Sequence, residues 1–376
     1  MNLLNIVSPR LDSLFLIFIV LFFTVSVLHG VSKSKNQISV IRIFSVSSRL
    51  NKKLVRLNLV TLLIILVFMA FGVMFGDFPV PKVKALSTAL WDRDSEFNFV
   101  INSIRSPRVV VAVLAGMCLA SSGAIFQSLI NNPLVSPDVI GVNSGAAVCA
   151  VILLAAGGQV TYLPFAAFIG AILAAMAVYI LSWKRGIAGT RLVLIGIGIN
   201  ALLAAVITFV QVRYPIERVM AAARWQAGTV FGATWDDVRI LGIGFLILFP
   251  AAFFLLSRLR ILQLGDETAI ALGSSVERDR LLLLTTGASL AAIAVAVVGP
   301  LGFVALMVPQ AARLLTGSIT GGSYIFTALL GGIFLLGADL IALHLFAPVM
   351  LPVGVVTAAL GGPYFLILLA RYNRAI

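Results

Sequence analysis

Long apolar stretches recur along the whole chain, and they decide which folds it can adopt. They are about 20 residues long, the length of helix that crosses the hydrocarbon core of a bilayer. Of the 376 residues, 61% are hydrophobic and 11% are charged, whereas a typical soluble domain has about 25% charged residues. The sequence therefore predicts an all-α polytopic membrane protein, with candidate spans at 12–30, 57–76, 107–129, 139–158, 162–182, 190–212, 239–256, 281–299, 303–315, 324–343 and 353–371.

The basic residues predict how these spans are oriented. Without the doubtful stretch 12–30, ten spans remain, and an even number places both ends of this part of the chain on one side. Lys and Arg collect beside spans on the cytoplasmic side of a membrane. Most of them lie on one side of the predicted topology, in 32–56, 183–191, 257–280 and the C-terminal tail. We therefore expect a multi-pass protein of the inner (cytoplasmic) membrane, with its C-terminus in the cytoplasm.

Several functional classes are disfavoured by the residues present. The net charge of +13 suits anionic membrane lipid but not nucleic acid, because the basic residues flank spans and do not alternate with aromatic ones. Catalysis needs clustered His, Asp, Glu or Cys, and the two histidines, His29 and His344, lie in distant spans. We expect no catalytic residue, no metal site and no cofactor.

The energy source for any transport is also expected to lie outside the chain. Asp339 is the only acid well inside a predicted span, which gives thin support for an ion-coupled secondary transporter. No lysine follows a glycine, so the phosphate-binding GxxxxGK[ST] motif is absent. A pump built on this chain would need ATP hydrolysis by a separate subunit and a cytoplasmic surface on which that subunit docks.

A polar segment, LGDETAIALGSSVERDR at 264–280, interrupts two apolar runs and holds four of the 14 acidic residues. Asp266 and Glu267 suit the first turn of a short helix, and Gly273 suits its end. Such a helix could insert into a groove of a partner and transmit its movement. A solvated loop with balanced charges explains the spacing equally well, so both interpretations stay open at this point.

Five ordered blocks together resemble the FecCD family, the permease subunits of binding-protein-dependent ABC importers for iron–siderophores, haem and vitamin B12. These blocks are RSPRVVVAVLAGMCLASSGAIFQSLINNPLVSPDVIGVNSGA (105–146), RLVLIGIGI (191–199), LGDETAIALGSSVERDR (264–280), GPLGFVALMVPQAARLLTG (299–317) and ADLIALHLFAPVMLPVGVVTAALGGPYFLILL (338–369). The resemblance runs from about residue 50 to 374. It divides the chain into an N-terminal extension, 1–48, with a possible extra span, and a permease domain, 49–376.

The resemblance implies a ten-helix permease with three kinds of protein partner: a second FecCD-type permease, P-loop ATPase subunits, and a periplasmic or surface siderophore-binding protein. Arg105 and Arg108 would point into water and dock the binding protein. The translocation path would include Ser121, Gln127, Asn132 and Asn200. Coupling helices that dock on the ATPase would include Leu264, Gly265, Asp266, Glu267, Ala271, Leu272 and Gly273, with the acidic residues keeping their tip hydrated and capped.

The expected cargo is a ferric siderophore. SGAIFQSL, NPLVSPD and LPVGVVT are similar to the family branch that carries ferric enterobactin, which points to a catecholate. A haem or cobalamin permease of the same family remains an alternative, and an ion-coupled secondary transporter is a more distant one.

Three positions depart from the family pattern. Gln310, Leu343 and Met350 stand where a histidine, an arginine and a glutamate are usual. Specialisation of one subunit in an asymmetric pair would explain such losses, so a heterodimer is favoured over a homodimer. The extension 1–48 lies outside the resemblance, as a true span or an over-extended start, and is expected to be dispensable.

Overall fold

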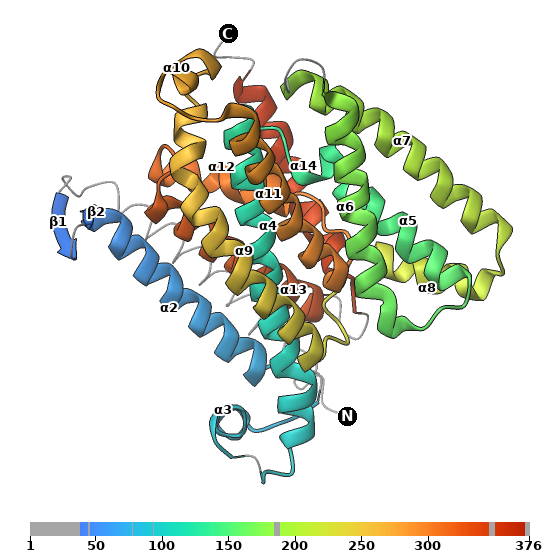
Figure 1. The fold of residues 1–376 in the computed structure, drawn as a ribbon. Coiled ribbons are helices and arrows are strands. Elements are labelled where there is room, and N and C mark those ends of the chain that lie inside the picture. Colours follow the sequence, from blue (N-terminus) through green and yellow to red (C-terminus); the bar gives the residue numbers. More distant parts are fainter. Residues whose placement is uncertain are drawn as a thin grey trace.

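Long helices lie side by side and cross the molecule from one end to the other (Figure 1). The computed structural model describes residues 38–43, 46–76, 78–92, 94–183, 189–345 and 350–372. The predicted span at 12–30 lies outside these residues.

Ten apolar helices in the described residues correspond to the ten predicted spans. Seven helical stretches are long and apolar enough to cross a bilayer, and three apolar helices are shorter. The ten are α2 (Lys52–Met74), α4 (Ser106–Leu129), α5 (Val142–Ala155), α6 (Leu163–Ser182), α7 (Gly189–Arg213), α9 (Trp235–Leu262), α11 (Val276–Val298), α12 (Val304–Thr316), α13 (Gly321–His344) and α14 (Val353–Tyr372). The all-α prediction is confirmed for this bundle.

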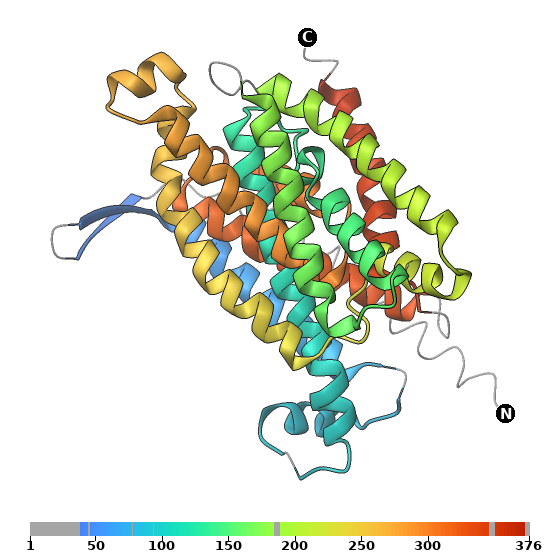
Figure 2. The same cartoon turned by 45° about the vertical axis from the view of Figure 1, so that its right-hand side comes forward.

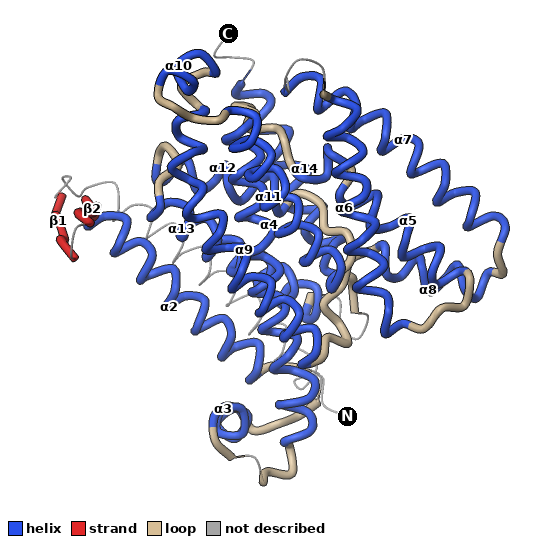
Figure 3. Tube along the Cα trace, viewed as in Figure 1, coloured by secondary structure: helices blue, strands red, loops and turns tan. Residues whose placement is uncertain are grey.

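Short elements connect the long helices. They are α3 (Lys82–Leu90), the π-helix η1 (Phe99–Arg105), the 3-10 helices η2 (Pro137–Ile140) and η3 (Val160–Tyr162), α8 (Ile216–Gln226) and α10 (Asp266–Ala271). The sequence did not predict the one hairpin among the described residues, which precedes α2 (Figure 3). In it, β1 (Ile38–Ile43) pairs antiparallel with β2 (Val46–Asn51), and Ile43 lies opposite Val46.

Helix α4 is the centre of the bundle. Its span is 83% buried within the chain, whereas the corresponding windows of α7 and α9 are 11% and 17% buried. Gly116 of α4 and Gly331 of α13 meet where the two helices cross, and a Cβ on either would collide with the backbone carbonyl of the other. Small residues allow such close approach, which drives helix association where lipid supplies no hydrophobic force.

The surface of the outer helices is apolar, as a membrane protein requires. Large hydrophobic side chains are exposed along α7 and α9, among them Leu194, Ile197, Leu202, Phe209, Ile243, Leu246, Ile247 and Phe254. An exposed apolar patch of this extent on a monomer marks a surface that another phase or another chain covers.

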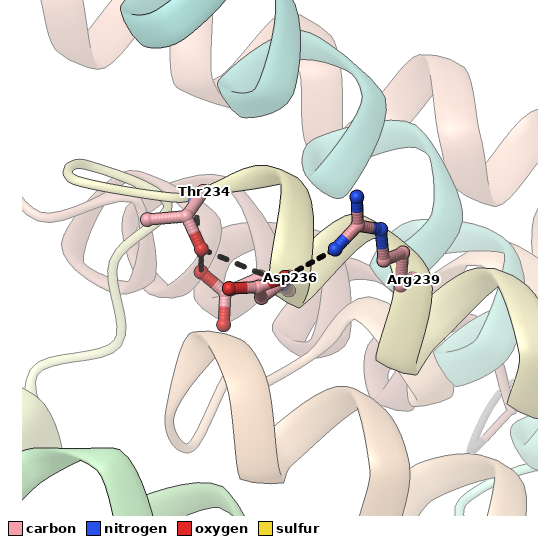
Figure 4. A network of polar contacts seen from close by, with 4 residues as sticks. Thr234, Asp236 and Arg239 are labelled. Atoms are coloured by element: carbon pink, nitrogen blue, oxygen red, sulfur yellow. Dashed lines mark hydrogen bonds and ion pairs between the residues drawn. The ribbon is translucent and has the colours of Figure 1, made fainter.

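The start of α9 shows how the sequence ends a loop and begins a span. Thr234 and Asp237 form a reciprocal capping box, in which the Thr234 backbone N–H donates to Asp237 Oδ2 at 2.8 Å. Next to the capping box, Arg239 Nη1 lies 2.7 Å from Asp236 Oδ1 (Figure 4). Both charged groups of that pair are exposed, so it adds little stability, and the capping box is what fixes where α9 begins.

The bundle has two different ends. Helix α10 projects from one end, the end at which α14 also finishes, whereas α3 and η1 form the opposite end (Figures 1 and 2). Every predicted site residue can therefore be placed relative to these two ends.

Candidate functional site

Helix α10 is a short surface helix between the long helices α9 and α11. Glycines flank it with left-handed backbone: Gly265 has φ +98° and Gly273 has φ +80°. At its C-terminal end, Gly273 N–H donates to Ile270 O and Ser274 N–H donates to Ala269 O, each at 2.9 Å. This pair of bonds is a Schellman ending, which favours glycine at the left-handed position. The local sequence thus fixes both bounds of α10.

The α10 segment exposes apolar side chains beside its exposed acids, Asp266 and Glu267. Leu264, Ile270 and Leu272 are each about 60% exposed, whereas Ala269 is fully buried against the bundle. An amphipathic helix with its apolar side outward is the arrangement used for helix-in-groove recognition. The segment has the surface chemistry of a docking helix.

Two polar contacts tie α10 to its neighbours. Asp266 Oδ1 lies 2.8 Å from Arg280 Nη2 of α11. Asp279 of α11 accepts a hydrogen bond from Ser274 Oγ at 2.6 Å and two from Arg258 Nη1 of α9, at 2.9 Å and 3.1 Å. The Asp279 side chain is 2% exposed, and a buried carboxylate with several donors holds its geometry strongly. These contacts join the α10 segment to both α9 and α11.

Arg105 lies at the opposite end, in η1, and is directed inward. Its side chain is buried, and its guanidinium donates from Nη1 to the Val73 carbonyl at 3.0 Å and from Nη2 to the Phe78 carbonyl at 2.6 Å. Gly76 leaves room for this group, because a Cβ there would lie 2.7 Å from Arg105 Nε. Arg105 thus closes the end of α2 against the start of α4.

Arg108 and Asp339 form a two-pronged ion pair between α4 and α13. Nε donates to Oδ2 at 2.8 Å and Nη2 to Oδ1 at 2.7 Å. The two side chains are 12% and 4% exposed, and the guanidinium also lies 5.8 Å from the centre of the Phe231 ring. A bidentate arginine–carboxylate pair combines charge with fixed geometry, so it locks these two helices at the end opposite to α10.

The comparison with protein families now decides what kind of protein carries these features. The sequence profile of the FecCD transport family matches residues 62–371. The chain belongs to the FecCD transport family. The match contains all ten apolar helices except the first turns of α2, and it contains α10 and both arginines.

Known permeases of this family are similar over most of their length. The ferric enterobactin transport system permease protein FepG of Escherichia coli is 39% identical over 305 residues, covering 81% of this chain and 92% of that protein. The Fe(3+)-citrate import system permease protein YfmE of Bacillus subtilis is 42% identical over 287 residues, covering 76% and 86%. A solved metal-chelate type ABC transporter in an inward-facing conformation superposes with a TM-score of 0.75 at 24% identity, covering 84% of this chain and 99% of that one, and it supports the fold.

In this FecCD protein, the predicted short helix with a glycine at its end is present. One surface segment around α10 contains all seven predicted coupling residues: Leu264, Gly265, Asp266, Glu267, Ala271, Leu272 and Gly273. The expectation that the acidic residues keep the tip hydrated and cap it is wrong in part. Asp279 is buried under Ser274 and Arg258, and the N-cap Gly265 receives no side-chain hydrogen bond. Only Asp279 is withdrawn from water in this way, whereas Asp266 and Glu267 of α10 are exposed and Asp266 also pairs with Arg280.

The predicted exposure of Arg105 and Arg108 is also wrong. Both lie at the end opposite to α10, as the topology predicted, but neither points into water. Sequence reasoning treated them as span-end residues and missed their partners. Arg108 lies near the start of one predicted span, and Asp339 lies near the end of another. The two spans run in opposite directions, so both residues have the same predicted membrane depth. This shared depth of two opposite charges was the signal from which the ion pair could have been predicted.

The four residues assigned to the translocation path have different environments. Ser121 and Gln127 have no exposed surface, and Gln127 Nε2 donates to the Leu306 carbonyl at 2.8 Å, joining α4 to α12. Asn132 is exposed in the loop after α4. Asn200 of α7 donates to the carbonyls of Asp138 and Val139 in η2 at 3.0 Å and 3.3 Å. Within one chain, therefore, Ser121 and Gln127 are buried in the core and Asn200 contacts another helix, whereas Asn132 alone of the four is exposed.

Proposed function

We propose that this chain is a permease subunit of an ABC importer that moves a ferric siderophore into the cytoplasm. The observation that carries the proposal is α10, a surface helix with exposed apolar side chains on a transport-family protein whose sequence lacks the phosphate-binding GxxxxGK[ST] motif. A protein of this kind needs an ATPase subunit. The exposed side chains of Leu264, Ile270 and Leu272 give the α10 segment an apolar surface on which that subunit would dock. The chain itself then contributes no ATP hydrolysis.

The polar contacts around α10 support its role in coupling. Movement of a docked ATPase would act on α10 and pass through Asp266–Arg280 and Asp279–Arg258 to α11 and α9. The two left-handed glycines allow sharp turns on either side without strain. The α10 end would be cytoplasmic, together with the end of α14, and the end with α3 and η1 would face the siderophore-binding protein.

A second permease would complete the translocation path. The face of α7 with exposed Leu194, Ile197 and Leu202 is too apolar for water, and a partner chain would cover it. The departures at Gln310, Leu343 and Met350 favour a different FecCD-type chain as this partner. Leu343 is buried, which suits an apolar residue in place of an arginine.

The cargo we favour is a catecholate siderophore such as ferric enterobactin. Its support is the similarity to the enterobactin permease described above, but a citrate-complex permease is similar to a comparable degree. Haem or cobalamin remains the alternative cargo. The binding protein selects the cargo in such systems. The permease sequence therefore supports the import mechanism more directly than it supports one class of siderophore.

The test is reconstitution of the two permeases with the ATPase in proteoliposomes. ATP hydrolysis should rise when the loaded binding protein is added, and labelled ferric siderophore should enter only with ATP. Uptake that persists without the ATPase and disappears with an uncoupler would instead show an ion-coupled transporter. Competition among unlabelled ferric enterobactin, ferric citrate, haem and cobalamin identifies the cargo.

A further inference from the structure

A groove between α6 and α11 is not used by the proposed transport mechanism. It encloses about 310 Å³ and is lined by one face of each helix, including Ile172, Met176 and Ile180 of α6 and Leu281, Leu284 and Ala288 of α11. Met176 and Ile180 are 49% and 63% exposed, so the groove opens on the lateral surface of the bundle. In a spanning protein, this surface faces acyl chains, and a volume above about 300 Å³ is that of a ligand site.

Three polar atoms without hydrogen-bond partners lie in the last turn of α6 and the first two turns of α11, the turns that follow α10. They are Tyr179 Oη, Glu277 Oε2 and Arg280 Nη1. Tyr179 lines the groove, and both charged residues lie within electrostatic reach of it. Arg280 Nη1 and Glu277 Oε1 form only a loose ion pair at 3.7 Å, beyond hydrogen-bond distance. Polar atoms without partners are rare at such positions in native structures, and the Glu277 side chain is 40% exposed, so these groups are available to a polar headgroup at the surface.

The three groups differ in charge, and this defines the ligand. An arginine and a phenol are donors that suit a phosphate, whereas a glutamate accepts from an ammonium group. Trp183 stacks edge-on against Tyr179, with ring centroids 5.6 Å apart, and it is half exposed at the end of α6. Tryptophan at a span end marks the depth of the lipid headgroups.

We propose that this groove binds a phosphatidylethanolamine molecule. One acyl chain lies between α6 and α11, the phosphate accepts hydrogen bonds from Arg280 and Tyr179, and the ethanolamine ammonium pairs with Glu277. Because Arg280 also holds Asp266 of α10, the lipid would bear on the α10 segment. Which leaflet supplies the lipid follows from the proposed orientation, but the site itself does not depend on the proposed function.

The probes are phosphatidylethanolamine and phosphatidylglycerol added to the delipidated full-length chain, with binding measured by native mass spectrometry. We expect roughly tenfold tighter binding of phosphatidylethanolamine, since a hydrogen-bonded ion pair is lost with the glycerol headgroup. Glu277→Gln should abolish this preference, and Tyr179→Phe should weaken the binding of both lipids. Equal affinities of the unaltered chain for the two lipids would overturn the headgroup assignment.

A second variant tests the acyl-chain groove. Ala175→Phe places a ring into the groove and should remove saturable binding of both lipids. Its control is Ala251→Phe, at an exposed alanine of α9 outside the groove, which should bind both lipids normally. Normal binding by Ala175→Phe would overturn the proposal. If Ala175→Phe does not fold, the results for Glu277→Gln and Tyr179→Phe decide. The proposal would also be overturned if Glu277→Gln kept the preference for phosphatidylethanolamine and Tyr179→Phe bound both lipids with unchanged affinity.

Discussion

Arg108 on α4 and Asp339 on α13 are 231 residues apart in sequence, yet they form two parallel hydrogen bonds of 2.8 Å and 2.7 Å. The pair lies at the end of the bundle opposite to α10, and eight residues away along each helix α4 and α13 also meet through Gly116 and Gly331. A buried carboxylate that is paired in this way is neutralised by its partner. Asp339 therefore has a structural role that explains its presence in a span without ion coupling.

Breaking this pair should destabilise the protein. Asp339→Asn leaves the Arg108 guanidinium without its carboxylate, and Arg108→Ala leaves the Asp339 carboxylate without its donors. For either variant we expect the free energy of unfolding to fall by about 3–5 kcal/mol. The double variant Arg108→Met with Asp339→Leu should recover much of that loss, because neither charge remains. Thermal unfolding in detergent measures both effects. A normal melting temperature for Asp339→Asn would show that the pair contributes nothing.

Disruption of α10 should uncouple transport without removing the protein from the membrane. Gly265→Pro is incompatible with φ +98°, because proline fixes φ near −65°, and Ala271→Arg places a charge on an exposed position of the helix. We expect affinity for the ATPase to fall about tenfold or more, measured by pull-down and by cargo-stimulated hydrolysis. Ala221→Arg, at an exposed position of α8 away from α10, is the matched control. Unchanged binding in both α10 variants would refute the docking assignment.

Removal of the carboxylate at Asp279 should separate docking from transmission. Asp279→Leu leaves the outer face of α10 intact but removes the acceptor shared by Ser274 and Arg258. We expect the ATPase to bind within about twofold of normal, while cargo-stimulated hydrolysis falls several-fold, because interactions of a partly buried network are worth more than about 1 kcal/mol. Ser274→Ala should show a smaller change in the same direction. Full stimulation in Asp279→Leu would mean that the movement takes another route.

Arg105 should govern stability, not the affinity for a binding protein. Arg105→Ala leaves the carbonyl of Val73 unpaired in a buried place, which costs about 1–3 kcal/mol. Lys84→Glu is the control, because Lys84 lies at the same end, is half exposed and pairs only loosely with Glu96 at 3.8 Å, so its stability effect should stay within about 0.5 kcal/mol. Thermal unfolding and binding-protein titration are measured on the same samples. A large drop in affinity for Arg105→Ala with an unchanged melting temperature would restore the docking role.

The N-terminal extension should be dispensable for transport. A chain beginning at Ser47 keeps Lys52, Lys53 and Arg56, the basic residues that orient α2, and the family match begins only at residue 62. It removes β1 and Val46, and with them the strand pairing of β2. The measurement is cargo uptake per molecule of permease in the membrane, and the amount of inserted permease is quantified separately. Normal insertion with lost uptake would show that the extension takes part in the mechanism.

The sequence alone determined the ten apolar helices and the bounds of α10, because both depend on local properties. Apolar length sets which segments cross the bilayer, and the left-handed preference of glycine sets where α10 turns, at Gly265 and Gly273. The basic clusters, by the same local logic, predicted which ends lie together.

Only the tertiary structure decided which charged residues face inward. Arg105 and Arg108 read as hydrated span-end residues, and Asp279 reads as part of a solvated loop, since sequence spacing does not reveal partners on other helices. Their burial follows from packing: the crossing of α4 with α13 brings Arg108 to Asp339, and the antiparallel arrangement of α9 and α11 brings Arg258 to Asp279. A buried charge is stable only beside its partner, and the partner's position is a property of the whole fold.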